Sequence, residues 1–195
     1  MNVQLIVGLG NPGRIYRNTW HNMGAATIEK LAGRWGVKFA AGKGDFIYAD
    51  ARKGGRKVTL LIPTSYMNRS GGPVSAWLRY HRVSPDEILV VYDDHDLPLG
   101  RIRIRPNGSS GGHRGMDDII RLVGSENIPR IRIGIRSEKE KGALASQVLS
   151  KIPKKLRDSV EGILDAAADA VEKTVTDGIT PAMNEFNNFT IDYSG

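Results

Sequence analysis

A glycine-rich turn directly after an apolar run constrains this chain more than any other stretch of it. Residues 3–7 are mostly apolar and predict a buried strand, and residues 8–13 hold three glycines and a proline that end it. Asn11, Tyr16 and His21 therefore follow the carboxyl end of one strand. Ligands of an open α/β sheet usually bind at that edge, so we interpret this stretch as the start of a site.

The same turn has a second interpretation, because its Gly-x-Gly-x-x-Gly spacing over residues 8–13 matches a dinucleotide-binding fingerprint. That fingerprint needs a helix directly after the turn, with backbone N–H groups free to hold the pyrophosphate. Pro12 removes one N–H group, and the first convincing helical pattern begins only near Asn22. A nicotinamide- or flavin-dependent oxidoreductase is thus a weak alternative.

Composition sets the outer limits of the interpretation. We interpret residues 1–195 as one domain with a full hydrophobic core. The formal net charge of +7 favours a polyanionic partner. The chain has no cysteine, which excludes disulfides and thiolate chemistry, and it has no apolar run long enough to span a bilayer. We expect a soluble cytoplasmic protein, although a chain trimmed of an organelle transit peptide would have the same features.

Periodicity predicts an alternation of strands and helices along the whole chain. Expected strands cover 46–49 and 58–62 as a hairpin through Gly54 and Gly55, then 88–92, 101–105 and 131–135. Expected helices cover 22–35 and 72–81, start near Met116 and Pro153, and end with a short helix over 181–187. Residues 137–141 predict a charged loop.

Two later strand ends also deliver polar side chains. The strand over 58–62 leads to Tyr66 and Asn68, although an asparagine there is as readily a turn residue. The strand over 88–92 leads to Asp93, Asp94, His95 and Asp96. These groups could bind a metal ion; alternatively, one carboxylate orients His21, as the third member of a catalytic triad orients its base.

Arginine is concentrated in one region. Residues 101–136 contain eight arginines, no lysine and three acids. Arg101, Arg103 and Arg105 alternate with isoleucine, which places them on one face of a strand. Since arginine binds phosphate with two hydrogen bonds, this pattern indicates nucleic-acid binding, with a solvated basic face as the alternative. The glycine-rich turn over 108–115 could hold a phosphate or form a pocket wall.

Five motifs in order then resemble those of the bacterial-type peptidyl-tRNA hydrolases, over almost the whole chain. They are Gly8-Leu-Gly-Asn-Pro-Gly13, His21-Asn-x-Gly24, Pro63-Thr-Ser-Tyr-Met-Asn68, Asp93-Asp-x-Asp-Leu-Pro-x-Gly100 and Gly111-Gly-His-x-Gly115. The resemblance implies a single α/β domain, in which a twisted, mixed, mostly parallel sheet packs between helices. It also implies a hydrolase that needs no metal or cofactor.

The resemblance assigns catalytic roles to four residues. His21 would take a proton from water, and Asp93 would hold its imidazole in the required tautomer. Asn11 and Asn68 would bind the main chain of the nascent peptide and polarise the ester carbonyl. One oriented base with donors for the developing oxyanion is sufficient to cleave an ester.

The resemblance also implies binding residues. Tyr16 and Tyr66 would line the cleft, while Arg105 and Arg132 would bind tRNA phosphates, and we add Arg103, His113 and Arg114 as substrate or tRNA contacts. Two positions depart from the family pattern: Arg114 stands where asparagine is frequent, and Trp20 stands where arginine is usual, which predicts an altered tRNA contact.

The sequence therefore predicts a monomeric peptidyl-tRNA hydrolase without membrane contact. It would cleave the ester between a peptide and the terminal ribose of tRNA, and so recycle tRNA from prematurely released peptidyl-tRNA. The main alternative is a non-catalytic RNA-binding or RNA-processing factor on the same fold, which only the intact His21 and Asp93 argue against.

Overall fold

A computed structural model describes residues 2–136, 148–188 and 190–191 of the chain. Its centre is a seven-stranded sheet in the order β2-β3-β4-β1-β5-β7-β6. In the described part of the chain only β3 and β6 run against the other strands. The strands are β1 (Leu5–Gly8), β2 (Ala40–Ala41), β3 (Phe46–Lys53), β4 (Arg56–Pro63), β5 (Ile88–Pro98), β6 (Ile102–Arg105) and β7 (Arg130–Arg136).

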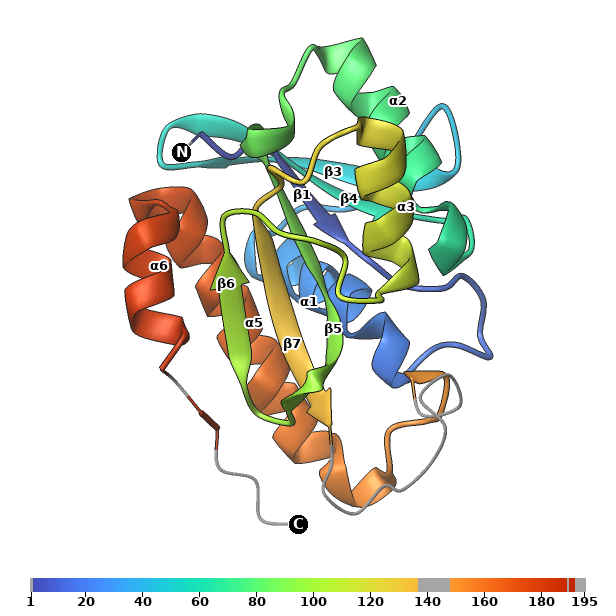
Figure 1. Cartoon of the computed structure of the whole chain (residues 1–195), viewed down its shortest axis with the longest axis vertical. Helices are drawn as coiled ribbons and strands as arrows, with labels where there is room; N and C mark the ends of the chain where they lie inside the picture. Colours follow the sequence, from blue (N-terminus) through green and yellow to red (C-terminus); the bar gives the residue numbers. More distant parts are fainter. Residues whose placement is uncertain (1, 137–147, 189, 192–195) are drawn as a thin grey trace.

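Helices cover both faces of this sheet (Figure 1). Helices α2 and α3 lie in front of the sheet in that view, α1 and α5 lie behind it, and α6 lies beside β6. The helices are α1 (Met23–Arg34), α2 (Gly71–His81), α3 (Arg114–Val123), α5 (Arg157–Asp177) and α6 (Ile179–Phe186). None of the helices in the described ranges is long and apolar enough to cross a membrane.

Two hydrophobic cores result from the alternation of side chains along the strands. Ile6, Leu60 and Val91 pack with α1 and α5 in one core. Their neighbours Leu61 and Val90 face the other way and pack with α2 and α3. Strands with both faces buried read as continuous apolar runs, which is why the sequence pattern identifies them.

The sequence prediction of an α/β fold with a mixed, mostly parallel sheet is confirmed, and so is the hairpin through Gly54 and Gly55. The predicted end of the fifth strand at Tyr92 is wrong. Strand β5 continues to Pro98, because Asp93 and Asp94 keep their pairing with β7. The charged loop predicted for residues 137–141 lies outside the described residues.

A close contact between α1 and the sheet fixes the position of the residues just before that helix. A Cβ atom on Gly24 would lie 2.2 Å from the backbone oxygen of Val91, so only glycine allows this approach. His21 lies in the short 3-10 turn Trp20–Asn22 immediately before α1. The contact thereby brings His21 against β5, the strand that carries Asp93.

Candidate active site

The loop between β1 and α1 is held by backbone and amide hydrogen bonds. The N–H of Leu9 donates to the carbonyl of Val91 (3.0 Å), and the N–H of Ala25 donates to the carbonyl of Leu9 (2.9 Å). The side-chain amide of Asn22 bonds the backbone of Asn11 twice: its Oδ1 accepts the N–H of Asn11 and its Nδ2 donates to the carbonyl of Asn11, both at 2.9 Å. The glycine-rich turn is therefore a rigid support for Asn11 and His21.

His21 and Asp93 form the centre of the site, and both are buried. Nδ1 of His21 lies 2.9 Å from Oδ1 and 3.0 Å from Oδ2 of Asp93. A nitrogen that faces a carboxylate carries the proton, so Nδ1 is the donor. The other ring nitrogen, Nε2, is then left with a lone pair, which is the tautomer that a general base requires.

His113 contacts the same carboxylate from the other side. Its Nε2 lies 3.2 Å from Oδ1 of Asp93, and its Nδ1 accepts the backbone N–H of Met116 (3.2 Å) at the start of α3. Because Nδ1 is an acceptor, Nε2 carries the proton and donates to Asp93. Both ring nitrogens of His113 are thus occupied within the protein, which leaves neither for the substrate contact that the sequence predicts.

The charge of Asp93 is stabilised by these two histidines. Burial alone would raise the pKa of this carboxyl group, but the hydrogen bonds from His113 and His21 outweigh burial and hold the pKa well below its usual range. Asp93 is therefore an anion at neutral pH despite its burial. It both fixes the tautomer of His21 and stabilises an imidazolium that forms beside it.

The amide of Asn11 bridges from the glycine-rich turn to the turn that follows β4. Its Oδ1 accepts the backbone N–H of Met67 (2.8 Å), which fixes the orientation of the amide. Its Nδ2 forms no hydrogen bond within the described residues and remains available as a donor. Asn68 follows Met67 in the 3-10 turn Met67–Arg69, and its side chain is exposed. Two amides thus come from the ends of β1 and β4.

Three further residues that we predicted to contact the substrate are partly or fully exposed to solvent. Tyr16 and Tyr66 meet edge to face with ring centroids 6.3 Å apart, and Tyr66 is 57% exposed. Arg114 is the first residue of α3, directly after His113, and it is exposed. Arg114 is thus next in the chain to the histidine that contacts Asp93, and the two tyrosines contact each other.

The predicted phosphate-binding arginines lie on one face of β6 and β7. Arg103 pairs in register with Arg132, and Arg105 pairs with Arg130. Arg105, Arg130 and Arg132 line a hollow of about 210 Å³ together with Tyr92 and residues 107–111. We call this pocket the arginine hollow; its loop leads directly to His113. Arg101 turns away and donates to Thr190 instead.

The four arginines of this face differ in their partners. Arg130 is buried and donates to the carbonyls of Ile128, Gly108, Ser109 and Glu126, so it holds the loop in place. Arg132 pairs with Asp94. Nε of Arg103 is buried without a hydrogen-bond partner in the described part of the chain. Burial, and then the charges of Arg103 and Arg132, lower the pKa of Arg105, so the hollow carries excess positive charge.

The side chains of residues 93–96, which we considered as metal ligands, bind other partners. Asp94 accepts the side chain of Arg132, and His95 contacts Asp96 at 3.3 Å, so the four residues 93–96 do not converge on one point. Within the described ranges, His21, Asp93 and His113 are the group whose ligand atoms lie close enough for a metal ion, within 4.8 Å of one another. Those same atoms form the hydrogen bonds described above.

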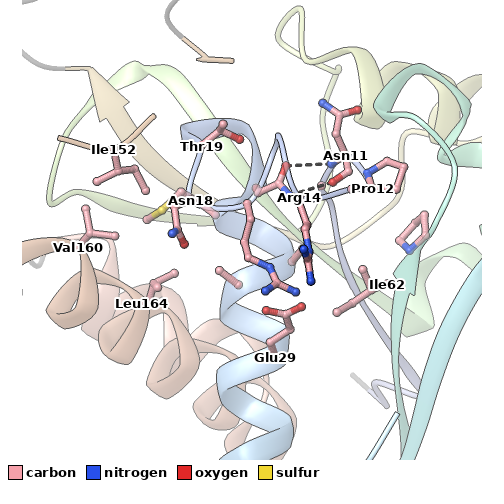
Figure 2. A pocket seen from close by; sticks show the side chains of 18 of the residues that line it. Asn11, Pro12, Arg14, Asn18, Thr19, Glu29, Ile62, Ile152, Val160 and Leu164 are labelled. Atoms are coloured by element: carbon pink, nitrogen blue, oxygen red, sulfur yellow. Dashed lines mark hydrogen bonds between the residues drawn. The ribbon is translucent and has the colours of Figure 1, made fainter. Parts of the chain in front are cut away.

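The dinucleotide alternative lacks its helix. Residues 14–18 form turns, and α1 begins only at Met23, so the glycine-rich turn does not lead directly into a helix. In the first turn of α1, the N–H of Ala25 is already bonded to the carbonyl of Leu9 (2.9 Å) and is not free for a pyrophosphate. A larger hollow of about 550 Å³ does lie beside this loop (Figure 2). Val160 and Leu164 of α5 lie on one side of it and Ile62 of β4 on the other, with α1 between them. Its lining includes Asn11 but neither His21 nor Asp93.

Sequence reasoning missed some residues of the site. Asn22, which holds Asn11, was read only as a helix start, although its place beside His21 was a signal. The alternation of residues along β7 does not indicate that Arg130 supports the neighbouring loop. Trp20, which stands where the family usually has arginine, has a completely buried side chain, and the altered tRNA contact stays a prediction.

A buried carboxylate behind an imidazole, with an amide donor beside it on the edge of an α/β sheet, is the arrangement by which a hydrolase activates water. A family model described as peptidyl-tRNA hydrolase matches residues 5–194. The chain therefore belongs to the peptidyl-tRNA hydrolase family, a family of enzymes that act on peptidyl-tRNA.

Individual relatives agree. The peptidyl-tRNA hydrolase of a Synechococcus strain is 44% identical over 194 residues, covering 99% of this chain and 85% of that protein. That of a Haemophilus influenzae strain is 42% identical, with 97% and 98% covered. The crystal structure of peptidyl-tRNA hydrolase from Acinetobacter baumannii superimposes with a TM-score of 0.89 at 36% identity, covering 97% of this chain and 96% of that one. These matches do not favour the non-catalytic alternative.

Proposed function

We propose that His21 is the general base with which this enzyme hydrolyses the ester between a nascent peptide and the 3′-terminal ribose of tRNA. The observation that carries the proposal is the bond from Nδ1 of His21 to both carboxylate oxygens of Asp93, at 2.9 and 3.0 Å. It leaves Nε2 unprotonated, so that this atom can accept a proton from water.

The reaction then follows from the geometry. A water oxygen attacks the ester carbonyl carbon while its proton passes to Nε2 of His21. The carbonyl oxygen becomes an oxyanion, which Nδ2 of Asn11 and the amide of Asn68 stabilise. When the bond to the ribose oxygen breaks, the imidazolium returns the proton to that oxygen. The products are a free peptide acid and tRNA.

Asp93 and His113 act behind the base. Asp93 holds His21 in the required tautomer and stabilises the imidazolium, as the third group of a triad does. His113 donates to Asp93 and accepts from Met116, so its role is to position the carboxylate rather than to bind substrate. This role replaces the substrate contact that we predicted for it.

The arginine hollow is the proposed site for a phosphate of the tRNA acceptor end. Arg105 lines the hollow and forms no ion pair with a carboxylate within the described residues, and the neighbouring Arg132 is the one that Asp94 neutralises, which favours an anionic ligand. Tyr16, Tyr66 and the exposed Arg114 are placed to contact the substrate near the ester. An acylated α-nitrogen suits this cleft, whereas a free ammonium would bring an unpaired charge against the same amides.

The cellular role follows as a further part of the proposal. The enzyme would act as a monomer in the cytoplasm, without a cofactor, and would recycle tRNA from prematurely released peptidyl-tRNA. The family membership and the basic charge of +7 support this role.

The test is release of N-acetylated amino acid from N-acetyl-aminoacyl-tRNA in the presence of EDTA. We expect turnover by the wild type, and a loss of about 10²- to 10⁴-fold in His21→Ala with tRNA binding retained. Equal loss of binding and turnover would contradict the role of His21. Binding of tRNA by the wild type without any release would favour the RNA-binding alternative.

A further inference from the structure

A further hollow lies on the side of α2 and α3 that is opposite to the arginine hollow. It has a volume of about 540 Å³ and lies between α2 and the outer face of β3 and β4. Five aromatic or imidazole rings line it: Phe46 and Tyr48 from β3, and Trp77, Tyr80 and His81 from α2. We call it the aromatic groove.

The rings of the aromatic groove are partly stacked and partly open. Trp77 and His81 have ring centroids 4.2 Å apart, and Phe46 and Tyr48 are 6.1 Å apart. Tyr80 contacts His81 at 4.9 Å, yet it is 84% exposed. A tyrosine so exposed beside four other rings forms an open apolar surface for a ligand.

The charges of the aromatic groove are largely balanced. Nζ of Lys57 lies 2.9 Å from Asp50, and the hydroxyl of Thr59 also donates to this carboxylate (2.7 Å). Lys43 remains at the rim. Polyanion binding needs uncompensated positive charge, as in the arginine hollow, so this balance disfavours a phosphate backbone as the ligand.

The aromatic groove begins a short way along the chain from the proposed catalytic site. Phe46 pairs with Pro63, the last residue of β4. Four residues later along the chain, the N–H of Met67 binds the catalytic Asn11. Four residues reach at most about 14 Å, so the near end of the groove lies within a short peptide's length of the ester.

The order of the strands gives the substrate a direction. The arginine hollow lies at β6 and β7, the His21–Asp93 pair lies at β1 and β5, and the aromatic groove lies beyond them at β3 and β4. If the tRNA lies over the arginines and the ester lies at His21, the acyl chain must leave on the opposite side. That side leads to the aromatic groove.

We infer that the aromatic groove binds the nascent peptide itself, at residues about four or more positions from the ester. The inference rests on the proposed function. Flat rings contact apolar side chains and peptide planes without demanding one sequence, which suits a substrate class whose peptides differ in sequence. The groove thereby adds affinity for long peptides to a site whose chemistry needs only the last residue.

The experiment compares two substrates that share tRNA and esterified residue. One is N-acetyl-leucyl-tRNA, and the other carries an N-acetylated octapeptide that ends in leucine and has apolar residues at its distant positions. The variants are Tyr80→Ser and Ala76→Glu, both at exposed positions in the groove, and the control is Leu122→Ser, an equally simple loss of an exposed apolar side chain on α3.

We expect both groove variants to raise KM for the octapeptidyl substrate about three- to tenfold. Their kcat values, and their KM for the short substrate, should stay unchanged, and Leu122→Ser should match the wild type throughout. Equal effects on both substrates, or no effect on either, would overturn the inference. A wild type that hydrolyses neither substrate would refute the proposed function, and with it this role of the groove.

Discussion

The arginine hollow and the aromatic groove lie on the same face of the sheet, on either side of α2 and α3, but they balance their charges in opposite ways. In the groove, Lys57 is neutralised by Asp50. In the hollow, Asp94 neutralises Arg132, and burial, then the charges of Arg103 and Arg132, lower the pKa of Arg105. The arginine hollow therefore favours an anionic ligand, whereas the aromatic groove offers ring surfaces to an uncharged one.

This difference teaches how a single sheet edge can serve a substrate with two unlike halves. Peptidyl-tRNA joins a polyanion to a largely uncharged chain, and the ester lies at their junction. The His21–Asp93 pair lies between the two flanks at β1 and β5. We therefore expect changes at the centre to alter turnover, and changes on each flank to alter affinity for one half of the substrate.

The largest effect is expected for Asp93→Asn at the centre. An amide there would donate its N–H to Nδ1 of His21 and leave the proton on Nε2, which is the wrong tautomer for a base. We expect kcat for N-acetyl-aminoacyl-tRNA to fall by roughly two to three orders of magnitude, with KM little changed. Steady-state kinetics on the purified variant would measure both.

Asp96→Asn is the matched control, because Asp96 lies exposed on the same strand. It should keep wild-type kcat. If Asp93→Asn kept turnover within tenfold of the wild type, Asp93 would not set the tautomer of His21, and the proposed mechanism would be wrong.

A smaller effect is expected for Arg105→Ala in the arginine hollow. Loss of one charge-assisted phosphate contact should weaken binding of deacylated tRNA about tenfold at low salt. The slope of log affinity against log salt concentration should also become shallower by about one. A fluorescence titration at several salt concentrations gives both values.

Lys57→Met supplies the comparison for Arg105→Ala, since it also removes one positive charge but from the aromatic groove, where Asp50 balances it. Its salt slope should equal that of the wild type. The contrast between the flanks fails if Lys57→Met shifts the slope as much as Arg105→Ala does, or if Arg105→Ala leaves it unchanged.

The sequence predicted, for a physical reason, that polar side chains from several strand ends gather at one edge of the sheet, and the structure brings His21 to Asp93 and Asn11 to the backbone of Met67. The carboxyl ends of neighbouring parallel strands meet at one edge, so Asn11, His21, Asn68 and Asp93 could be expected to converge. The strand pattern alone did not decide which carboxylate of residues 93–96 faces His21; the resemblance to the family named Asp93, and the structure shows that contact. The contact depends on β5 continuing past Tyr92 in register with β7, which no local pattern encodes.

The same limit applies to both flanks. Alternation predicted Arg101, Arg103 and Arg105 on one face, but Arg101 lies before β6 and donates to Thr190 instead. The role of Arg130 as a support under the loop depends on tertiary contacts, which alternation does not encode. The aromatic groove had no sequence signal at all, because its rings come from β3 and α2 and meet only when the helix packs on the sheet.

The smallest effect is expected for Asp50→Asn in the aromatic groove. Burial raises the pKa of Asp50, but hydrogen bonds from Lys57 and Thr59 outweigh it and lower this pKa overall. A carboxyl group with a lowered pKa in the folded state stabilises the protein above the ordinary aspartate pKa of about 3.9, and that contribution is lost as the pH falls through the folded value.

Since both partners of the Lys57–Asp50 pair are more than a third exposed, solvent screens it. Asp50→Asn should therefore lower the free energy of unfolding by less than about 1 kcal/mol at neutral pH. Urea melts should show that this difference shrinks below about pH 4. A difference that stayed constant with pH would come from packing rather than charge. A steeper salt slope for tRNA binding would mean that the freed Lys57 faces the tRNA half of the substrate.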